Sequence, residues 1–593
     1  MKFRWTLAPA QPLLAGQLAH QLKLSPLLAK CLLNRDLCAP DAITGFLEPR
    51  LKNLRDPFLL PDMDRAVTRL LRAREQSETV VIFGDYDVDG VTSTALLLVF
   101  LRALGFRVDC YLPSRMDEGY GLSQEAVENC LRRYPARVLL AVDCGSSTVS
   151  SIEWLKEQGV DVIVLDHHQL SSPPPRPSAM VNPRNVSPAP ALIANGAQQN
   201  GEPPFAELCS AGLAFKLAHA ILKRARENNL PGAGEFDLRP LLDLVALGTI
   251  ADLVPLTSEN RILVTAGLHR LKITSRPGIV ALKQVAQCPA DLGTYEVGFQ
   301  LAPRLNAAGR LETAEAALNL LLAPDLMTAM PLARQLDSCN RERQTLERAI
   351  ALEAIEAVRS HFHAENDFVI VEGREPWHIG VVGIVASRVL QQFYRPTIIV
   401  GGDGEFMRGS GRSISGFNLA EALRECDDLL VRHGGHAMAA GLTITPGKLE
   451  LFRERLNGVA RRALKPDHLQ PGLRLDAEVG LDELTLERIN ELGHLNPVGL
   501  GNPAVQFCAR NLAHARPLQR VGAEKQHVKM WLADERNTVE AVWWGAGAEA
   551  LPVGRFDVAF APQTNEYNGR RTVQLKVLDW RPADKSGPSL SGI

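Results

Sequence analysis

The sequence lacks the paired cysteines of a zinc ribbon or of a disulfide framework. Its ten cysteines are scattered over 593 residues, and no two of them form a CxxC pair. Cysteines used in this way are typical of reduced thiols in a reducing compartment. We therefore predict a cytoplasmic protein without structural zinc.

A long apolar run and a strong excess of charge are also missing. The apolar run Ala95–Leu101 is too short to cross a membrane, and proline and polar residues interrupt any signal-peptide core near the start of the chain. We therefore predict that the protein does not associate with membranes. We also predict that it is a monomer. The net charge is −2, so any nucleic-acid site has to be a local basic surface. The length predicts several domains.

The most distinctive feature that is present is the stretch TVVIFGDYDVDGVTST, Thr79–Thr94. A β-prone run ends in glycine, Asp85, Asp87 and Asp89 follow at every second position, and a helical pattern comes next. Carboxylates this close together repel one another at neutral pH unless cations lie between them. We interpret the stretch as a metal-binding loop at the carboxyl end of a strand, where open α/β sheets bind their ligands.

Two other interpretations apply to this loop taken alone. An EF-hand that began at Asp85 would need a bidentate glutamate at its twelfth position, where the chain has Leu96, and a helix before it, where the chain has a strand pattern. The second alternative is a solvated acidic turn.

Residues 78–170 alternate between strand and helix patterns, which predicts a parallel sheet in an α/β fold. Helix patterns cover residues 91–104, 122–133 and 149–158. The expected strands are Thr79–Gly84, Arg107–Leu112, Arg137–Val142 and Asp161–Leu165.

The later strands end in more residues of the same chemistry. One apolar run leads to Asp143, the next leads to Asp166, His167 and His168, and Asp252 follows an apolar helical stretch. The carboxyl ends of parallel strands share one edge of the sheet, so we expect these side chains beside the acidic loop. For Asp252, a helix cap or a buried ion pair is an alternative. For His167 and His168, the alternative to a role in the metal site is that one histidine is structural and the other is simply exposed.

The remaining patterns divide the chain into further domains. Residues 1–77 are predicted to be a helical appendage that packs on a catalytic domain of residues 78–325. Residues 326–362 are predicted to form a connecting helix, and residues 363–465 a second α/β domain. Several short strands with turn signals predict a small β-barrel in residues 466–593.

Residues suited to DNA lie in glycine-rich or small-residue loops and in the barrel. Glycine lets backbone N–H groups approach a phosphate, and arginine can clamp one. For each of these loops, the alternative is an ordinary turn or surface loop without a role in binding. About half of the aromatic residues in the barrel could equally belong to its hydrophobic core. The candidates for DNA or phosphate binding are Arg115, Ser210, Arg304, Asn306, Arg310, Arg408, Ser410, Gly434, Gly435 and His436. The candidates for base stacking are Trp531, Trp543, Trp544 and Tyr567.

Seven motifs, taken in order, resemble the DHH phosphoesterase superfamily. They are DYDVDG, AVDCGSS, LDHH, GTIADLVPL, APRLNAAGRL, GSGRSI and GGHAMAAG. Over nearly the whole chain, the resemblance is to the bacterial members that degrade single-stranded DNA. It implies a DHH catalytic domain, a long connecting helix, a DHH-associated domain and an OB fold, together with two Mn²⁺ or Mg²⁺ ions.

The resemblance also implies roles for individual residues. One ion would be held by Asp89, Asp143, His167 and Asp252. The other would be held by Asp87 and the shared Asp143, with Asp85 nearby. His168 would contact the scissile phosphate, so His168, Asp85 and Asp143 are the catalytic candidates. Carboxylate and imidazole ligands without thiolates suit Mn²⁺ or Mg²⁺, which agrees with this implication.

The implied function is a metal-dependent exonuclease that degrades single-stranded DNA from the 5′ end to 5′-mononucleotides. The resemblance places it in DNA recombination and repair (base excision, mismatch and replication-fork processing), with single-strand binding protein and a helicase as partners. A phosphodiesterase acting on short oligonucleotides or cyclic dinucleotides is one alternative, although it would need neither the barrel nor the N-terminal part. A metal-stabilised single-strand binding protein without catalysis is another.

Overall fold

A computed structural model describes residues 2–114, 117–119, 121–185, 205–311, 313–402 and 404–583. The chain divides into two compact units, which are described separately. The parallel-sheet unit comprises Glu48–Thr345 and Pro497–Asn502. The barrel unit comprises Met1–Leu47, Leu346–Asn496 and Pro503–Ile593. Among the helices within these described ranges, none has the length and apolar character needed to cross a lipid bilayer.

The parallel-sheet unit is built on five strands in the order β3-β2-β4-β5-β6, all of them parallel. Their bounds are β2 Thr79–Gly84, β3 Arg107–Tyr111, β4 Val138–Val142, β5 Asp161–Leu165 and β6 Ala179–Val181. The parallel sheet predicted from the sequence is confirmed. The edge strand β6 was not predicted, because its three residues lie in a proline-rich stretch and become a strand only by pairing with β5.

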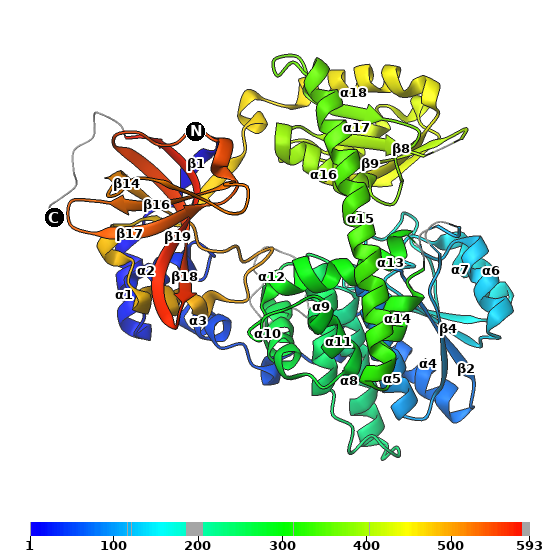
Figure 1. Cartoon of the computed structure of the whole chain (residues 1–593). Helices are drawn as coiled ribbons and strands as arrows, with labels where there is room; N and C mark the ends of the chain where they lie inside the picture. The colour runs from blue at the N-terminus through cyan, green and yellow to red at the C-terminus, as the bar shows by residue number, and fades with distance from the viewer. Residues whose placement is uncertain are drawn as a thin grey trace. The chain divides into compact units, whose positions relative to one another are not determined.

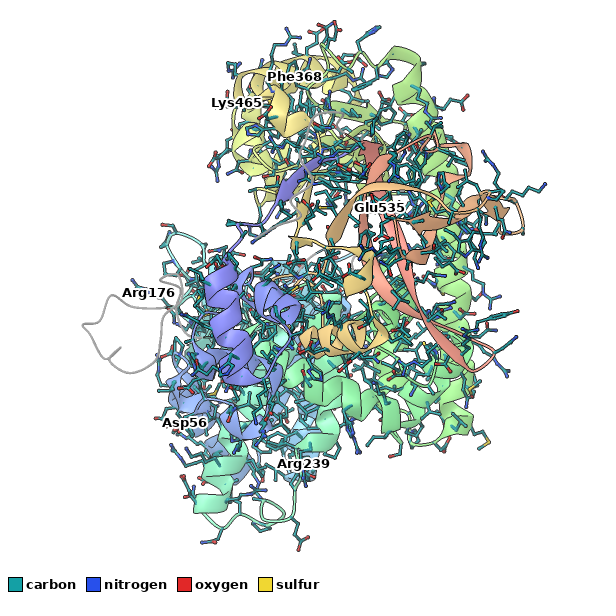
Figure 2. The ribbon with its side chains drawn as sticks, turned by 90° about the vertical axis from the view of Figure 1, so that its left-hand side faces the viewer. Asp56, Arg176, Arg239, Phe368, Lys465 and Glu535 are labelled. Atoms are coloured by element: carbon teal, nitrogen blue, oxygen red, sulfur yellow. The ribbon has the colours of Figure 1, made fainter. Side chains whose placement is uncertain are left out.

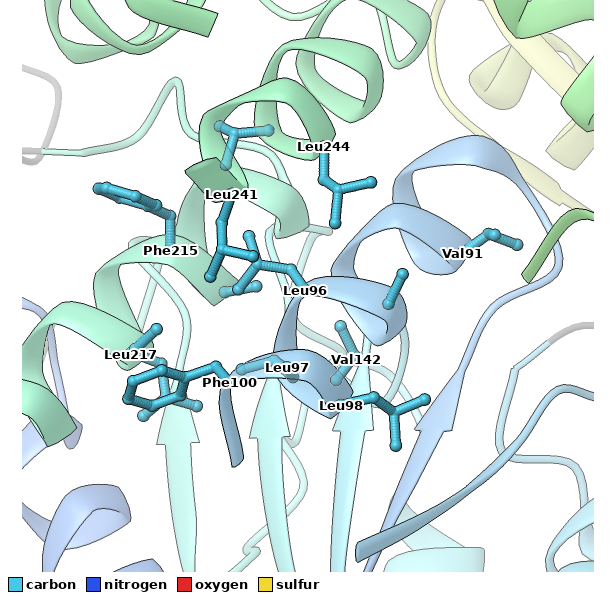
Figure 3. Close-up of a cluster of buried hydrophobic side chains, with 14 of the residues drawn as sticks. Val91, Leu96, Leu97, Leu98, Phe100, Val142, Phe215, Leu217, Leu241 and Leu244 are labelled. Carbon is cyan, nitrogen blue, oxygen red and sulfur yellow. The ribbon is translucent and has the colours of Figure 1, made fainter. Parts of the chain in front are cut away.

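Helices cover both faces of this sheet. They are α4 Met63–Glu75, α5 Val88–Ala103, α6 Gln124–Arg133, α7 Val149–Glu157, α8 Ser210–Glu227 and α9 Leu242–Ala251. Alternate residues of β2 point to opposite faces. Ile82 belongs to the same buried cluster as α5, α8 and α9, while Phe83 belongs to the cluster under α6 and α7. Figure 3 shows the first cluster, where Leu97 and Phe100 of α5 pack near Leu217 of α8. This core fixes the end of β2 and the start of α5, where the acidic loop lies.

Residues 1–47 pack on the barrel, which corrects the expectation that residues 1–77 form an appendage on the catalytic domain. The helices of this segment are α1 Pro12–Leu22, α2 Pro26–Leu33 and α3 Pro40–Leu47. Leu28 and Leu32 are buried in one cluster with Phe507 and Phe560 of the barrel. Residues 48–77, including α4, belong to the parallel-sheet unit. An apolar helix face shows that it needs a partner, but it does not identify that partner.

The predicted connecting helix is confirmed as α15, Leu326–His361. Its 36 residues span roughly 54 Å at 1.5 Å per residue. Figure 1 shows it as one continuous rod.

The second α/β domain has a five-stranded sheet in the order β10-β11-β9-β8-β7. Its strands are β7 Ile370–Gly373, β8 Thr397–Gly401, β9 Met407–Arg412, β10 Arg432–Gly435 and β11 Ala439–Ile444. The sequence predicted that Arg408, Ser410, Gly434, Gly435 and His436 lie in glycine-rich loops, whereas all of them except His436 lie in strands β9 and β10. Cross-strand pairs such as Gly434 with Gly441 supply hydrogen-bond partners that the local sequence does not reveal.

The predicted C-terminal barrel is confirmed. Seven strands follow the order β13-β14-β18-β19-β17-β16-β15, and an additional pairing of β14 with β16 closes the sheet. The strands are β13 Ala477–Glu478, β14 Phe507–His514, β15 Gln519–Val521, β16 His527–Ala533, β17 Thr538–Trp543, β18 Phe556–Tyr567 and β19 Arg570–Pro582. In Figure 2, the side chain of Glu535 marks the turn between β16 and β17.

Candidate metal centre

Acidic and histidine side chains meet at the carboxyl ends of β2, β4 and β5, at the edge predicted from the sequence. Within each of three overlapping groups, the potential ligand atoms lie within 4.8 Å of one another. The groups are Asp85, Asp87 and Asp143; Asp89, His167 and Asp252; and Asp143, Asp166, His167 and His168. Residues from four separate stretches of sequence thus form one cluster, and the shared Asp143 links two of the groups.

Two atoms of the cluster favour a bound cation. His167 Nε2 lies 3.5 Å from Asp143 Oδ1 and 3.5 Å from Asp252 Oδ2. Both His167 Nε2 and Asp252 Oδ2 are buried, and neither has a hydrogen-bond partner among the described residues. Buried polar atoms are almost always satisfied, so a partner of another kind is expected here. Oxygen and imidazole ligands without thiolates suit Mn²⁺ or Mg²⁺, and the cluster therefore fits a divalent cation.

The start of α8 orients two of the acids. The backbone N–H groups of Ser210 and Ala211 donate to the carboxylate oxygens of Asp89 at 2.7 and 2.8 Å. The Ser210 hydroxyl donates to Asp143 Oδ1 at 2.9 Å. Ser210 is fully buried, so the prediction that it binds DNA phosphate is wrong. This helix N-terminus attracts an anion as expected, but the anion is the carboxylate of Asp89.

Close packing and an unusual backbone conformation also position the acids. A Cβ atom on Gly248 of α9 would lie 2.9 Å from Asp89 Oδ1 and 2.5 Å from Thr92 Oγ1, so only glycine lets α9 approach α5 here. Asp143 has a φ of 65°, which is sparsely populated by residues other than glycine. Backbone strain of this kind is most common at functional sites, where the surrounding structure holds the residue in place.

Asp166 orients the histidine pair, a role that the sequence did not reveal. Its buried carboxylate accepts hydrogen bonds from the backbone N–H groups of Ser146, His167 and His168 at 3.0, 2.8 and 3.2 Å. It also lies 2.7 Å from His168 Nδ1. The signal in the sequence was an acid at a strand end, which does not distinguish a ligand from a residue that orients one.

Burial and mutual repulsion alter the ionisation of the cluster in the absence of cations. Burial and the neighbouring carboxylates raise the pKa of Asp89 to about 7 and that of Asp252 to about 9, and they raise the pKa of Asp143 well above its ordinary value. Burial, together with the neighbouring His168, lowers the pKa of His167 to about 4. Without bound cations, some of these carboxyl groups therefore keep a proton at neutral pH, which reduces the repulsion between them.

Asp166 and His168 of the cluster form an ion pair. Burial alone would raise the pKa of Asp166, but the hydrogen bond and charge of His168 outweigh it and hold that pKa below its ordinary value. Burial alone would lower the pKa of His168, but Asp166 raises it to about 9. At neutral pH the metal-free site therefore holds a cationic His168.

We predict that the metal-free protein loses thermal stability as the pH rises from 6.5 to 8.5, and that Mn²⁺ restores it. A carboxyl whose pKa is raised by folding stabilises the protein fully below its unfolded pKa, and that stabilisation is lost as the pH rises through the folded pKa. His167 has little effect in this window, because both its folded and unfolded pKa values lie at or below its lower end. Mn²⁺ at a concentration of 100 times its Kd would add about 2.7 kcal/mol to the free energy of unfolding.

Differential scanning fluorimetry with EDTA or Mn²⁺ at each pH measures this effect. The melting temperature in EDTA is expected to fall between pH 6.5 and 8.5, and the increment from Mn²⁺ to grow. Asp252→Asn should flatten the decline. An increment that is the same at both pH values would contradict the prediction.

The segment of residues 301–311 differs from the predicted phosphate-binding loop in two respects. The segment is a helix, α13 Ala302–Leu311, and not a loop. Arg304 Nε donates to Asp337 Oδ1 at 2.9 Å and its Nη1 donates to the carbonyl of Gln300, so its guanidinium is held by the protein. Asn306 Oδ1 accepts from the Val88 N–H at 3.1 Å and thereby supports the acidic loop. Arg310 is half-buried on the same helix.

The remaining phosphate candidates lie on the second α/β domain. Arg408, Gly434, Gly435 and His436 are exposed, and Ser410 is half-buried. Strand pairing places Gly441 beside both Gly434 and Ser410, so a row of small residues crosses β10, β11 and β9. The surface is thus open to a phosphate chain. Arg115 lies outside the described residues.

The four barrel aromatics differ in exposure. Tyr567 is 73% exposed and Trp544 is 51% exposed. Trp531 is half-buried, and the charged groups of Arg516 and Lys529 each lie 5.4 Å from its ring centroid. Trp543 packs against the hydrophobic core of the barrel, which argues against a base-stacking role for it.

Three family models match the chain. They are the DHH family N-terminal domain over residues 79–249, the DHHA1 domain over residues 366–462 and the RecJ OB domain over residues 475–579. The chain is 38% identical over 586 residues to the single-stranded-DNA-specific exonuclease RecJ of Bacillus subtilis, covering 98% of this chain and 71% of the relative.

Two solved structures have a similar fold. The crystal structure of RecJ in complex with Mn²⁺ from Thermus thermophilus has a TM-score of 0.82 and 30% identity, covering 98% of this chain and 80% of that one. The complex of the same protein with Mg²⁺ has a TM-score of 0.75 and 30% identity, covering 98% and 79%. Both are metal complexes, in agreement with a candidate metal site in the acidic cluster.

Proposed function

Because the chain belongs to the RecJ family of the DHH superfamily, we propose that it is a metal-dependent exonuclease that degrades single-stranded DNA. The observation that carries this proposal is the cluster of acids and histidines at the carboxyl edge of the parallel sheet. A protein that only binds DNA has no need to gather so many buried carboxylates, since each carries a desolvation cost.

We infer two Mn²⁺ or Mg²⁺ ions at this cluster. Asp89, Asp143, His167 and Asp252 would hold one ion. Asp87 and the shared Asp143 would hold the other, with Asp85 beside it. When bound, the ions would activate a water molecule and neutralise charge on the phosphodiester group.

The protein itself positions a cationic donor beside these ligands. Asp166 fixes the orientation of the His168 ring and raises its pKa to about 9 in the metal-free site. His168 is 38% exposed in its side chain, whereas Asp166 beneath it is almost completely buried. We propose that His168 contacts the scissile phosphate and that Asp166 holds it in place.

Two further surfaces would bind the DNA strand. Arg408, His436 and the small residues of β9, β10 and β11 are proposed to contact phosphates, since exposed glycine backbone allows close approach. Trp531, Trp544 and Tyr567 are proposed to stack with bases, which is a sequence-tolerant mode of binding.

From the likeness to the family, we propose that degradation starts at the 5′ end and releases mononucleotides. We also propose a role in DNA recombination and repair. The same likeness supports single-strand binding protein and a helicase as partners.

End-blocked, labelled single strands test the proposal in the presence of Mn²⁺. We expect release of 5′-mononucleotides from strands blocked at the 3′ end and no release from strands blocked at the 5′ end. The opposite pattern would reverse the direction. Digestion of dinucleotides alone would support the small-substrate alternative, and binding without cleavage would support the non-catalytic one.

A double substitution, Trp544→Ala with Tyr567→Ala, is predicted to weaken binding of long single strands. Loss of base stacking costs about 1–3 kcal/mol per base, so the Kd should rise by roughly tenfold or more. Fluorescence anisotropy in EDTA with strands of 6 and 30 nucleotides measures the change. Exposed Leu352→Ala on α15 serves as the control. An equal loss for both lengths would indicate a structural role for the aromatics.

A further inference from the structure

Six residues from the C-terminal part of the sequence belong to the parallel-sheet unit. These residues, Pro497–Asn502, are grouped with that unit although the chain on both sides belongs to the barrel unit. We propose that this segment, called the strap, positions the carboxylate of Asp252 and thereby sets the affinity of the metal centre. The inference rests on the proposed metal-dependent function.

The strap is a closed turn with its own hydrogen bonds. The Gly499 N–H donates to the Asn502 carbonyl at 2.9 Å, and the Asn502 N–H donates to the Gly499 carbonyl at 3.2 Å. The fully buried Asn502 side chain donates to the Pro497 carbonyl at 2.8 Å. The strap is therefore a rigid piece and not a loose connection.

Hydrogen bonds attach the strap to the rest of the parallel-sheet unit. The Leu256 N–H donates to the Leu500 carbonyl at 2.7 Å. The Thr294 hydroxyl donates to the Val498 carbonyl at 2.9 Å, and Arg261, which is nearly fully buried, donates to the Pro497 carbonyl at 3.3 Å. The first of these bonds reaches the loop that directly follows Asp252.

Two glycines of the strap pack tightly against the same loop. A Cβ atom on Gly499 would lie 2.7 Å from Leu256 Cδ1. A Cβ atom on Gly501 would lie 2.9 Å from Pro255 Cβ, and Gly501 has a φ of 73°. A larger side chain at Gly501 would push on Pro255 and so on the loop of residues 253–257, whereas one at Gly499 would first displace the Leu256 side chain.

Asp252 depends on this loop because it is the residue at which α9 ends. Its N–H still donates to the Gly248 carbonyl at 2.9 Å, but the next residue, Leu253, has a φ of 59° and leaves the helix. The Asp252 carboxylate lies 3.5 Å from His167 Nε2 within the candidate metal centre. A displacement on the order of 1 Å is enough to impair such a site.

Gly501→Ala in the full-length protein tests the proposal, and Gly554→Ala is its matched control. Gly554 has a φ of 70°, and a Cβ atom there would meet nothing within 4 Å. Both substitutions impose similar backbone strain, but only Gly501→Ala pushes on the Asp252 loop. Isothermal titration with Mn²⁺ in the absence of DNA is expected to show a Kd raised by about 10- to 100-fold for Gly501→Ala. The control should stay within about twofold.

Hydrogen exchange and a second variant complete the test. In EDTA, the amide of Leu256 should exchange faster in Gly501→Ala than in the control. Faster exchange together with an unchanged Mn²⁺ Kd would overturn the proposal, since the strap would then be merely structural. If Gly501→Ala does not fold, Thr294→Val removes a single hydrogen bond to the strap and is expected to raise the Kd by about 2- to 10-fold. No change in that variant would overturn the proposal.

Loss of the proposed function and loss of the strap's positioning role would give different experimental results. If the wild-type protein neither bound Mn²⁺ nor cleaved single strands, the proposed function itself would fail. If the wild type did both and the strap variants matched it, only the positioning role would fail. If the strap variants are active, their cleavage should need a higher Mn²⁺ concentration than that of the wild type while the KM for DNA stays unchanged. This result would support the positioning role of the strap.

Discussion

Replacing Asp143 with asparagine is expected to reduce DNA cleavage by roughly 1000-fold or more, the scale seen when an essential catalytic group is removed. Asp143 lies in one group with Asp85 and Asp87, and its Oδ1 lies 3.5 Å from His167 Nε2. It is shared by the ligand sets proposed for the two ions, so one substitution would remove a negative oxygen from both proposed sites. Asparagine is similar in size and can still accept the hydrogen bond from the Ser210 hydroxyl. The loss would thus reflect the charge on the ligand more than a collapse of the fold.

Mn²⁺-dependent release of nucleotides from labelled single strands measures this effect, and anisotropy in EDTA measures DNA binding. Binding in EDTA is expected to stay close to that of the wild type. Asp243→Asn is a suitable control, because Asp243 is an equally buried acid of α9 that pairs with Arg276 outside the cluster. The control should lower the melting temperature yet keep its Mn²⁺ response. Near wild-type cleavage by Asp143→Asn would refute the two-ion site.

Asp166→Asn is expected to slow cleavage by about 10- to 100-fold, the usual cost of losing a residue that orients a functional group. The carboxylate of Asp166 holds His168 through a contact of 2.7 Å and raises its pKa to about 9. Without that negative charge, the hydrogen bond and charge that most raise the pKa of His168 are lost while burial still lowers it, so this pKa should fall from about 9. A larger fraction of His168 would then be neutral at pH 8, where the metal-free wild type keeps it mostly protonated.

NMR titration of the histidines in EDTA provides a readout that does not depend on activity. The His168 resonance should titrate near pH 9 in the wild type and at a clearly lower pH in Asp166→Asn. Asp161→Asn is the control, since Asp161 lies at the opposite end of the same strand and pairs with Arg69. If His168 titrated alike in wild type and Asp166→Asn, the orienting role of Asp166 would be excluded.

The arrangement of the barrel unit limits how that unit can be studied by deletion. Removing residues 466–593 would also remove the strap and would expose the faces of α1 and α2 that pack on the barrel. A loss of activity in such a deletion would therefore not report on DNA binding by the barrel. Point substitutions at exposed aromatics separate these effects.

Local sequence patterns were enough to predict the architecture and most of the candidate metal cluster. Strand patterns that end in Asp85–Asp89, Asp143 and Asp166–His168 are local, and the rule that parallel strands end at one edge brings them together without any knowledge of the tertiary contacts. The long helix and the barrel followed from local periodicity and turn signals in the same way.

Which polar groups are available to bind DNA depends on tertiary contacts that the local sequence does not show. Arg304 has the residue type of a phosphate clamp, but Asp337 holds it, and Ser210 at a helix N-terminus meets carboxylates in place of DNA. The docking of residues 1–47, the pairing of the glycine-rich strands and the placement of the strap were equally hidden. Each depends on a partner far away in the sequence, and a local pattern shows that a group needs a partner without showing which residue provides it.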